Sequence, residues 1–202
     1  MDKIGLFCSA SDEISPLFFE KAHELGVWLG KNKKTLVYGG ANMGLMECVA
    51  KAAKEHGATV MGVVPTLIEE RGAVSDWLDV TFRTDNLSDR KDVILRESDI
   101  LIALPGGIGT LDEVFHVMAS GSIGYHAKKV IFYNVDGFWN PVLDLFRHLK
   151  STRFARRPLE RYCSVAEDLN ELIELLKKES GIIEELLSTL RRRLFIAEEE
   201  DV

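Results

Sequence analysis

A glycine-rich stretch from Leu104 to Glu113, with the sequence L-P-G-G-I-G-T-L-D-E, contains the residues best suited to chemistry. It follows an apolar run, Ile100–Leu104, that has the length of a buried strand, and it precedes a helical pattern. Glycines at a strand-to-helix turn let backbone N–H groups approach an anion, and the helix N-terminus adds the positive end of its dipole. The stretch therefore predicts a phosphate site formed by Gly106, Gly107, Ile108, Gly109 and Thr110.

Thr110 to Glu113 also fits a helix capping box, S/T-x-x-E, in which the two side chains only close the first turn of a helix. Three glycines within four residues favour ligand binding, because a plain turn needs one. A carboxylate beside a bound phosphate is repelled by it, so a functional Glu113 must face a neutral part of the ligand where positive charge develops. A sugar in an oxocarbenium-like transition state meets that description. Both interpretations of Glu113 are open at this point.

Arg90 and Lys91 lie near the start of a predicted helix, Leu87–Glu97, between Asp89 and Asp92. Cations in a first helical turn oppose the helix dipole at a cost of some tenths of a kcal/mol each, up to about 1. This local conflict indicates another role. Arg90 can bind a carboxylate or phosphate through two hydrogen bonds, and Lys91 can act as a point charge. The alternative is a pair of exposed salt bridges to Asp89 and Asp92.

A second glycine cluster, Gly39-Gly40-Ala41-Asn42-Met43-Gly44, also follows a predicted strand and opens a predicted helix. It lacks the Lys-Ser/Thr pair of a P-loop, and neither cluster has the G-x-G-x-x-G spacing of a dinucleotide fingerprint. Gly39 and Gly40 are candidates for anion binding, with close helix–strand packing as the alternative. Ser9, at the end of the first predicted strand, is placed to line the same cleft.

Apolar runs and helical patterns alternate along the chain. The predicted strands are Ile4–Ser9, Leu36–Tyr38, Ala58–Val64, Leu78–Phe82, Asp99–Leu104, Lys129–Val135 and Tyr162–Val165. The predicted helices are Pro16–Leu29 with Ser15 as N-cap, Met43–His56, Leu87–Glu97, Leu111–Ser120, Asn140–Lys150, and a helical stretch from Ala166 to Ile196 broken near Ser180. We expect a loop at Thr66–Asp76.

This alternation predicts an α/β fold: a doubly wound, Rossmann-like parallel sheet with helices on both faces. Ligands bind such sheets at the carboxyl ends of the strands, where both glycine clusters fall. The length of 202 residues fits one nucleotide-binding domain over residues 1–202, with a C-terminal helical extension at about 166–197.

Composition excludes several classes of function. The net charge of −7 argues against a nucleic-acid partner, and we see no signal peptide and no apolar run that could span a bilayer. The three cysteines, Cys8, Cys48 and Cys163, are scattered, which argues against a disulfide framework and a zinc site. We therefore expect a soluble cytoplasmic protein with buried thiols and no metal.

Taken together, these residues resemble the LONELY GUY (LOG) family, long mislabelled as lysine decarboxylases. The family pattern P-G-G-x-G-T-x-x-E matches Pro105–Glu113 at every fixed position. An Arg-Lys pair on the preceding helix matches Arg90-Lys91, and the element G-G-x-x-x-G-L-M matches Gly39–Met46. The resemblance runs from about Ile4 to Phe146.

The resemblance implies a phosphoribohydrolase that cleaves the N-glycosidic bond of purine nucleoside 5′-monophosphates, either cytokinin nucleotides or AMP, to the free base and ribose 5-phosphate. It implies Arg90 and Glu113 as the catalytic pair, the loop 106–110 as nucleotide-binding with Lys91 in support, no cofactor, and a homodimer. A nearby Arg90 would favour ionisation of Glu113 by lowering its pKa.

Some positions depart from the family pattern. Leu87-Ser88-Asp89 stands where plant members have a Met-His-x lead-in, and a plant-like glutamate after Pro65 has no clear counterpart, although Glu69 or Glu70 could substitute. These departures leave the base specificity open. Two rival interpretations are a non-catalytic nucleotide or cofactor carrier, such as the molybdenum-cofactor carriers of related fold, and a pyridoxal-phosphate lysine decarboxylase, for which Lys91 is the only lysine in the motifs.

Overall fold

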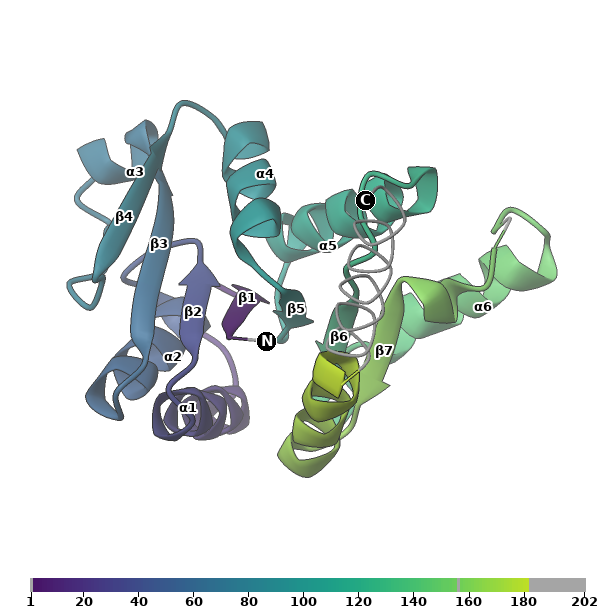
Figure 1. The fold of residues 1–202 in the computed structure, drawn as a ribbon, viewed down its shortest axis with the longest axis horizontal. Helices are drawn as coiled ribbons and strands as arrows, with labels where there is room; N and C mark the ends of the chain where they lie inside the picture. The colour runs from purple at the N-terminus through teal and green to yellow at the C-terminus, as the bar shows by residue number, and fades with distance from the viewer. Residues whose placement is uncertain (1, 156, 182–202) are drawn as a thin grey trace, which may run out of the picture.

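Seven parallel strands form the centre of the molecule. In the computed structural model, which describes residues 2–155 and 157–181, they make one sheet in the order β4-β3-β2-β1-β5-β6-β7 (Figure 1). This arrangement confirms the predicted α/β, doubly wound fold. The strands are β1 (Lys3–Phe7), β2 (Thr35–Tyr38), β3 (Thr59–Pro65), β4 (Val80–Thr84), β5 (Ile100–Ala103), β6 (Val130–Tyr133) and β7 (Cys163–Ala166).

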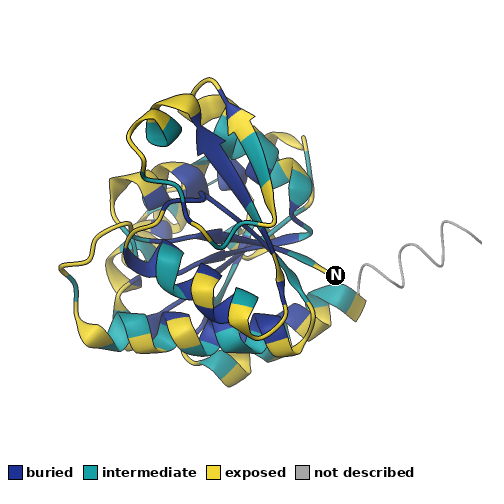
Figure 2. Cartoon of the chain, turned by 90° about the vertical axis from the view of Figure 1, so that its left-hand side faces the viewer, coloured by how far each residue is buried: buried dark blue, intermediate teal, exposed yellow. Residues whose placement is uncertain are grey.

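Helices cover both faces of the sheet. One face is covered by α1 (Pro16–Lys31), α2 (Gly44–Glu55) and a helical stretch at residues 169–181. The other face is covered by α4 (Leu87–Glu97), α5 (Ile108–Ile123) and α6 (Asn140–Ser151). Figure 2 shows buried strands enclosed by helices whose outer surfaces are exposed. Short helices at α3 (Thr66–Glu70), η1 (Val135–Gly137) and η2 (Leu159–Arg161) lie in the connections.

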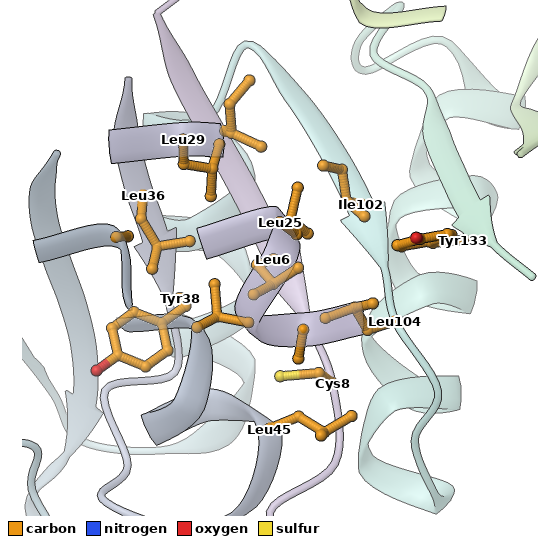
Figure 3. Packing of buried hydrophobic residues seen from close by; sticks show 14 of the residues in the cluster. Leu6, Cys8, Leu25, Leu29, Leu36, Tyr38, Leu45, Ile102, Leu104 and Tyr133 are labelled. Carbon is orange, nitrogen blue, oxygen red and sulfur yellow. The ribbon is translucent and has the colours of Figure 1, made fainter. Parts of the chain in front are cut away.

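Alternate strand residues point to the two faces. On β5, Ile100 and Ile102 belong to the core cluster under α1 and α2, whereas Leu101 belongs to the cluster under α4 and α5. Figure 3 shows the first cluster, in which Leu6 of β1 and Leu36 of β2 lie near side chains of α1. Burial on both faces explains why these strands read as continuous apolar runs instead of alternating ones.

The order of the strands reverses at β1. This strand pairs with β2 on one side and with β5 on the other. The chain leaves β1 toward α1 on one face and leaves β5 toward α5 on the opposite face. The two loops therefore part at the carboxyl ends of the strands, which is where doubly wound folds bind ligands. Both glycine clusters lie at this end of the sheet.

The predicted loop at Thr66–Asp76 is wrong in its first part, because Thr66–Glu70 forms α3. A helix of five residues is too short to show a helical period in the sequence. The predicted strand Leu78–Phe82 is displaced to β4, Val80–Thr84. Leu78 instead packs over Gly62, where a Cβ on the glycine would lie 2.6 Å from the leucine side chain.

Helix α5 is longer at both ends than the predicted Leu111–Ser120. It begins at Ile108, so Thr110 and Glu113 are the third and sixth helical residues and form no capping box. It continues to Ile123 and ends at Gly124, which adopts φ 102°. Packing of this helix on the sheet thus overrides the low helix propensity of its glycine and serine residues.

Two further details differ from the sequence prediction. Ser15 does precede α1, but its side chain makes no capping hydrogen bond. The C-terminal helical stretch begins at Leu169 and not at the predicted Ala166, because Ala166 ends β7 and pairs with Tyr133 of β6. It runs to Gly181, the last described residue, so the break predicted near Ser180 stays a prediction. The extension predicted beyond residue 181 lies outside the described residues. Within the described part of the chain, no helix has the length and apolar character needed to cross a bilayer.

Asn86 is the N-cap of α4, since its Oδ1 accepts hydrogen bonds from the N–H groups of Ser88 at 2.8 Å and Asp89 at 3.0 Å. We expect Asn86→Ala to lower the free energy of unfolding by about 1 kcal/mol. Ser15→Ala is the matched control, because it removes a cap position without a capping bond. Urea denaturation measures both variants, and equal losses would contradict this assignment.

Candidate functional site

A cavity of about 370 Å³ opens at the carboxyl ends of β1, β2 and β5. It is enclosed by the loops that follow these strands and by residues of α2, α3, α4 and α5. The structure brings most of the predicted site residues together here. Those that line the cavity are Ser9, Gly39, Arg90, Gly107, Gly109, Thr110 and Glu113.

The other four predicted site residues lie beside the cavity without lining it: Gly40, Lys91, Gly106 and Ile108. Gly40 makes a tight turn with φ 71°, and a Cβ on Gly106 would overlap with Thr110 Oγ1. The Ile108 side chain faces solvent and is 82% exposed. The two glycines therefore shape the loops, and Ile108 contributes no side chain to the cavity.

The N-terminus of α5 is open. Its N-cap is Gly107, which has no side chain to satisfy the first N–H groups of the helix, and these groups have no partner within the helix itself. A Cβ on Gly107 or Gly109 would meet no heavy atom within 4 Å. The loop thus presents free N–H groups and a positive helix end to the cavity, as an anion site requires.

The N-terminus of α2, at the second glycine cluster, is already bonded to the chain itself. The Gly44 N–H donates to Asp12 Oδ1 at 2.9 Å, and the Leu45 N–H donates to the Ser9 carbonyl at 2.9 Å. Asp12 therefore supplies an anion to α2 from within the protein. Of the two helix starts that the sequence singled out, that of α5 is the one left open to a ligand.

Arg90 is fixed inside the cavity by two contacts. Its Nε donates to the Val63 carbonyl at 3.1 Å, and its Nη1 lies 3.3 Å from Glu113 Oε1. Both side chains are largely buried, with 15% and 11% exposed for Arg90 and Glu113. Gly39 leaves the room that the guanidinium occupies, because a Cβ there would overlap with Arg90 Nη2.

The exposed salt bridges considered for Arg90 and Lys91 are not the ones that form. Lys91 Nζ donates to both carboxylate oxygens of Asp112 at 2.8 Å. Asp92 instead lies 3.0 Å from His116 Nε2 on α5. Three consecutive residues of α4 thus each meet a residue of α5, and the Arg90 side chain points to the cavity.

Burial raises the pKa of Glu113 to about 7. The positive charges of Arg90 and Lys91 oppose this rise, and the negative charge of Asp112 adds to it. Arg90 thus acts in the expected direction and lowers the pKa of Glu113, but the loss of water around the carboxyl outweighs the attraction of the guanidinium, and the pKa is raised overall. Near neutral pH this carboxyl exists in both protonation states.

The cavity also has an apolar lining that the motifs do not reveal. Met43, Met46, Ile68, Leu87 and Cys8 all line the cavity. Burial and the neighbouring Glu113 raise the pKa of the Cys8 thiol well above its ordinary value, so it is a neutral, apolar wall. The methionines fall in or beside the second glycine cluster, whereas Ile68 comes from α3, a helix too short to show a helical period.

Glu69, considered as a substitute for the plant-like glutamate, does not line the cavity. Arg83 on β4 donates to both of its carboxylate oxygens, at 2.8 and 3.0 Å. This pair connects α3 to the edge strand. Among the described residues, no group of three or more His, Cys, Asp or Glu side chains is arranged to hold a metal ion.

Comparison with known proteins decides the family. A family model described as "possible lysine decarboxylase" matches residues 46–176. A probable cytokinin riboside 5′-monophosphate phosphoribohydrolase of Oryza sativa subsp. japonica, LOGL2, is 33% identical over 189 residues, which are 94% of this chain and 78% of the relative. The chain belongs to the LOG family. A cytokinin riboside 5′-monophosphate phosphoribohydrolase of Arabidopsis thaliana, LOG7, is 32% identical over 93% of this LOG-family chain and 87% of its own length.

Solved structures share the fold of this LOG-family chain. The molybdenum cofactor binding protein of Rippkaea orientalis has a TM-score of 0.69 and 25% identity, over 88% of this chain and 96% of that one. The molybdenum cofactor carrier protein of Chlamydomonas reinhardtii also has a TM-score of 0.69, with 24% identity over 89% and 98% of the two chains. The second likeness shows the fold alone.

We expect Gly39→Ala to displace Arg90, since the new Cβ would overlap with Nη2 and lie 2.8 Å from Cζ. The free energy of unfolding should fall by about 1–3 kcal/mol, measured by urea denaturation. Gly109→Ala is the matched control: it adds a Cβ in open space inside α5, where alanine has the higher helix propensity, and should not lower stability. A crystal structure of Gly39→Ala with Arg90 in its original place would refute this account.

Proposed function

We propose that this protein hydrolyses the N-glycosidic bond of purine nucleoside 5′-monophosphates, of cytokinin type or AMP, to the free base and ribose 5-phosphate. The observation that carries the proposal is the buried Arg90–Glu113 pair, which lies in the same cavity as the open N-terminus of α5. A phosphate site and a carboxylate in one cavity suit a substrate with an anionic end and a neutral sugar. The names of the relatives in the LOG family support this assignment.

In this proposal the 5′-phosphate binds to the backbone N–H groups at Gly107–Thr110 and to the Thr110 hydroxyl, at the positive end of α5. The base lies against apolar residues such as Met43 and Ile68. Glu113 then faces C1′ of the ribose and not the phosphate. This placement removes the repulsion that a carboxylate would otherwise exert on the anion.

The reaction needs a water molecule and no cofactor. The bond between C1′ and the base nitrogen breaks as positive charge builds on the sugar, and the water oxygen bonds to C1′. Ionised Glu113 stabilises that charge and takes one proton from the water, which it then releases to solvent, while the departing base takes a proton from solvent at its nitrogen. Arg90, fixed to the Val63 carbonyl, keeps the carboxylate in place. A Glu113 pKa of about 7 supplies the ionised form in neutral solution.

Two rival functions fit this cavity less well. A passive carrier of a phosphorylated molecule is consistent with the fold, yet it gains nothing from a buried carboxylate beside its anion. A lysine decarboxylase needs a lysine to form a Schiff base with pyridoxal phosphate. None of the described residues that line the cavity is a lysine, and Lys91 is bonded to Asp112. The residues present do not fit that cofactor.

We expect Glu113→Gln to retain nucleotide binding and to lower turnover by about 10²–10⁴-fold, because the amide keeps the shape of the side chain and loses its charge. Chromatography of adenine released from AMP measures turnover, and calorimetry measures binding. Glu55→Gln, a change at an exposed helix end, should leave both unchanged. Wild-type protein that binds AMP and isopentenyladenosine monophosphate without releasing free base would favour the carrier.

We also propose a homodimer formed through an apolar surface beyond the site on α5. Phe115 and Ile123 on α5 are 37% and 74% exposed, and Phe154 after α6 is 81% exposed. They border a groove of about 640 Å³ whose other walls include Met118 and Leu149. An exposed apolar surface of this kind marks a protein interface. Because α5 begins at the catalytic cavity, a partner on this surface would lie close to the site.

We expect the wild-type protein to have the mass of two chains in light scattering, and Ile123→Glu to have the mass of one, because a buried unpaired carboxylate opposes association. Ile108→Glu is the control, since Ile108 is 82% exposed and does not border the groove. A monomeric wild-type protein, or an Ile123→Glu variant that stays dimeric, would refute the proposed interface.

A further inference from the structure

Two neighbouring cations on α4 meet two neighbouring carboxylates on α5. Lys91 Nζ donates to both oxygens of Asp112 at 2.8 Å, whereas Arg90 Nη1 lies 3.3 Å from a single oxygen of Glu113. The residues pair in crossed order, with 90 opposite 113 and 91 opposite 112. The tighter contact is therefore the one outside the cavity.

The two pairs differ in exposure. Arg90, Glu113 and Lys91 are 15%, 11% and 14% exposed, whereas Asp112 is 54% exposed. An ammonium as buried as that of Lys91 needs a carboxylate partner, and removal of that partner leaves an uncompensated charge. Asp112 and Glu113 are adjacent on α5, so the residue that binds Lys91 determines how much positive charge acts on Glu113.

We propose that Asp112 is a positioning residue, whose carboxylate binds Lys91 outside the cavity so that Arg90, and not Lys91, is the partner of Glu113. In this arrangement Glu113 can release and regain a proton during the reaction. With both cations bound to it, the carboxylate would be fixed in its ionised form, and its oxygens would be occupied by N–H donors instead of water.

The charges that face Glu113 support this inference. Arg90 and Lys91 on α4 favour its ionised form, whereas Asp112 on α5 and the burial of the side chain favour its neutral form. Cys8 on β1 also faces it, and its own pKa is raised by burial and by Glu113. Removal of the Asp112 charge should therefore lower the pKa of Glu113 from about 7, and removal of the Lys91 charge should raise it.

The first test is direct titration of Glu113 by carbon NMR in protein labelled at the glutamate carboxyl carbons, with Glu113→Gln to assign the signal. We expect Asp112→Asn to lower the midpoint by at least about half a pH unit and Lys91→Met to raise it. Asp112→Glu keeps the charge and should restore the wild-type midpoint. Asp92→Asn is the matched control, because Asp92 pairs with His116 and should leave the midpoint unchanged.

The second test uses the pH dependence of kcat/KM, and this part rests on the proposed function. If ionised Glu113 is the active form, kcat/KM falls as the pH drops through about 7 in the wild type. In Asp112→Asn this decline should occur at lower pH, with kcat affected more than KM. A purely structural role for Asp112 would lower stability without moving the midpoint.

The two proposals fail in distinguishable ways. An Asp112→Asn protein whose Glu113 titrates as in the wild type, or shifts no more than Asp92→Asn does, overturns the role of Asp112. Absence of base release from any nucleoside monophosphate overturns the proposed function, and the NMR titration still decides the role of Asp112. A shifted NMR midpoint together with a shifted pH profile supports both.

Discussion

The position of β1 between β2 and β5 is the constraint on which the rest of this structure depends. Because the chain departs from β1 and β5 to opposite faces, the loops at the end of the sheet separate and leave a cavity between them. The backbone of Ser9 connects both sides of that cavity. Its N–H donates to the Pro105 carbonyl at 3.1 Å, and its carbonyl accepts from the Leu45 N–H. The two glycine loops are thus placed relative to each other by β1.

The charged residues inside this cavity are expensive to bury, and the structure offsets the cost in specific ways. Arg90 has the Val63 carbonyl and the Glu113 carboxylate as partners, and the missing side chain of Gly39 leaves space for it. Glu113 is compensated incompletely, which is why its pKa rises instead of falling. Incomplete compensation is a stability cost, and it is also what places the titration of this carboxyl near neutral pH.

Local sequence patterns, such as apolar runs and helical periodicity, predicted most of the strands and helices. Strand and helix bounds outside the corrected segments differ from the prediction by at most three residues. The predictions that were wrong concern segments whose bounds depend on contacts between residues distant in the sequence. Leu78 packs over Gly62 and precedes β4, and α5 starts at Ile108, three residues before its first predicted residue. The same holds for the site. Local motifs predicted Arg90 and Glu113, whereas the positions of Ile68 and Asp12 depend on contacts that only the folded structure shows.

The fold alone does not separate an enzyme from a carrier, because a molybdenum cofactor binding protein has the same architecture at 25% identity. Two features of the cavity bear on this distinction: which helix start is open to an anion, and the position of Glu113 relative to that start. Asp12 satisfies the start of α2, whereas the start of α5 is open, so we place the proposed anion site at α5. Glu113 follows one and a half turns later on α5, buried and opposite Arg90. In the proposed function, repulsion between this carboxylate and the anion would weaken binding, and we infer that its role lies in a later step, in which positive charge develops on the part of the ligand that it faces.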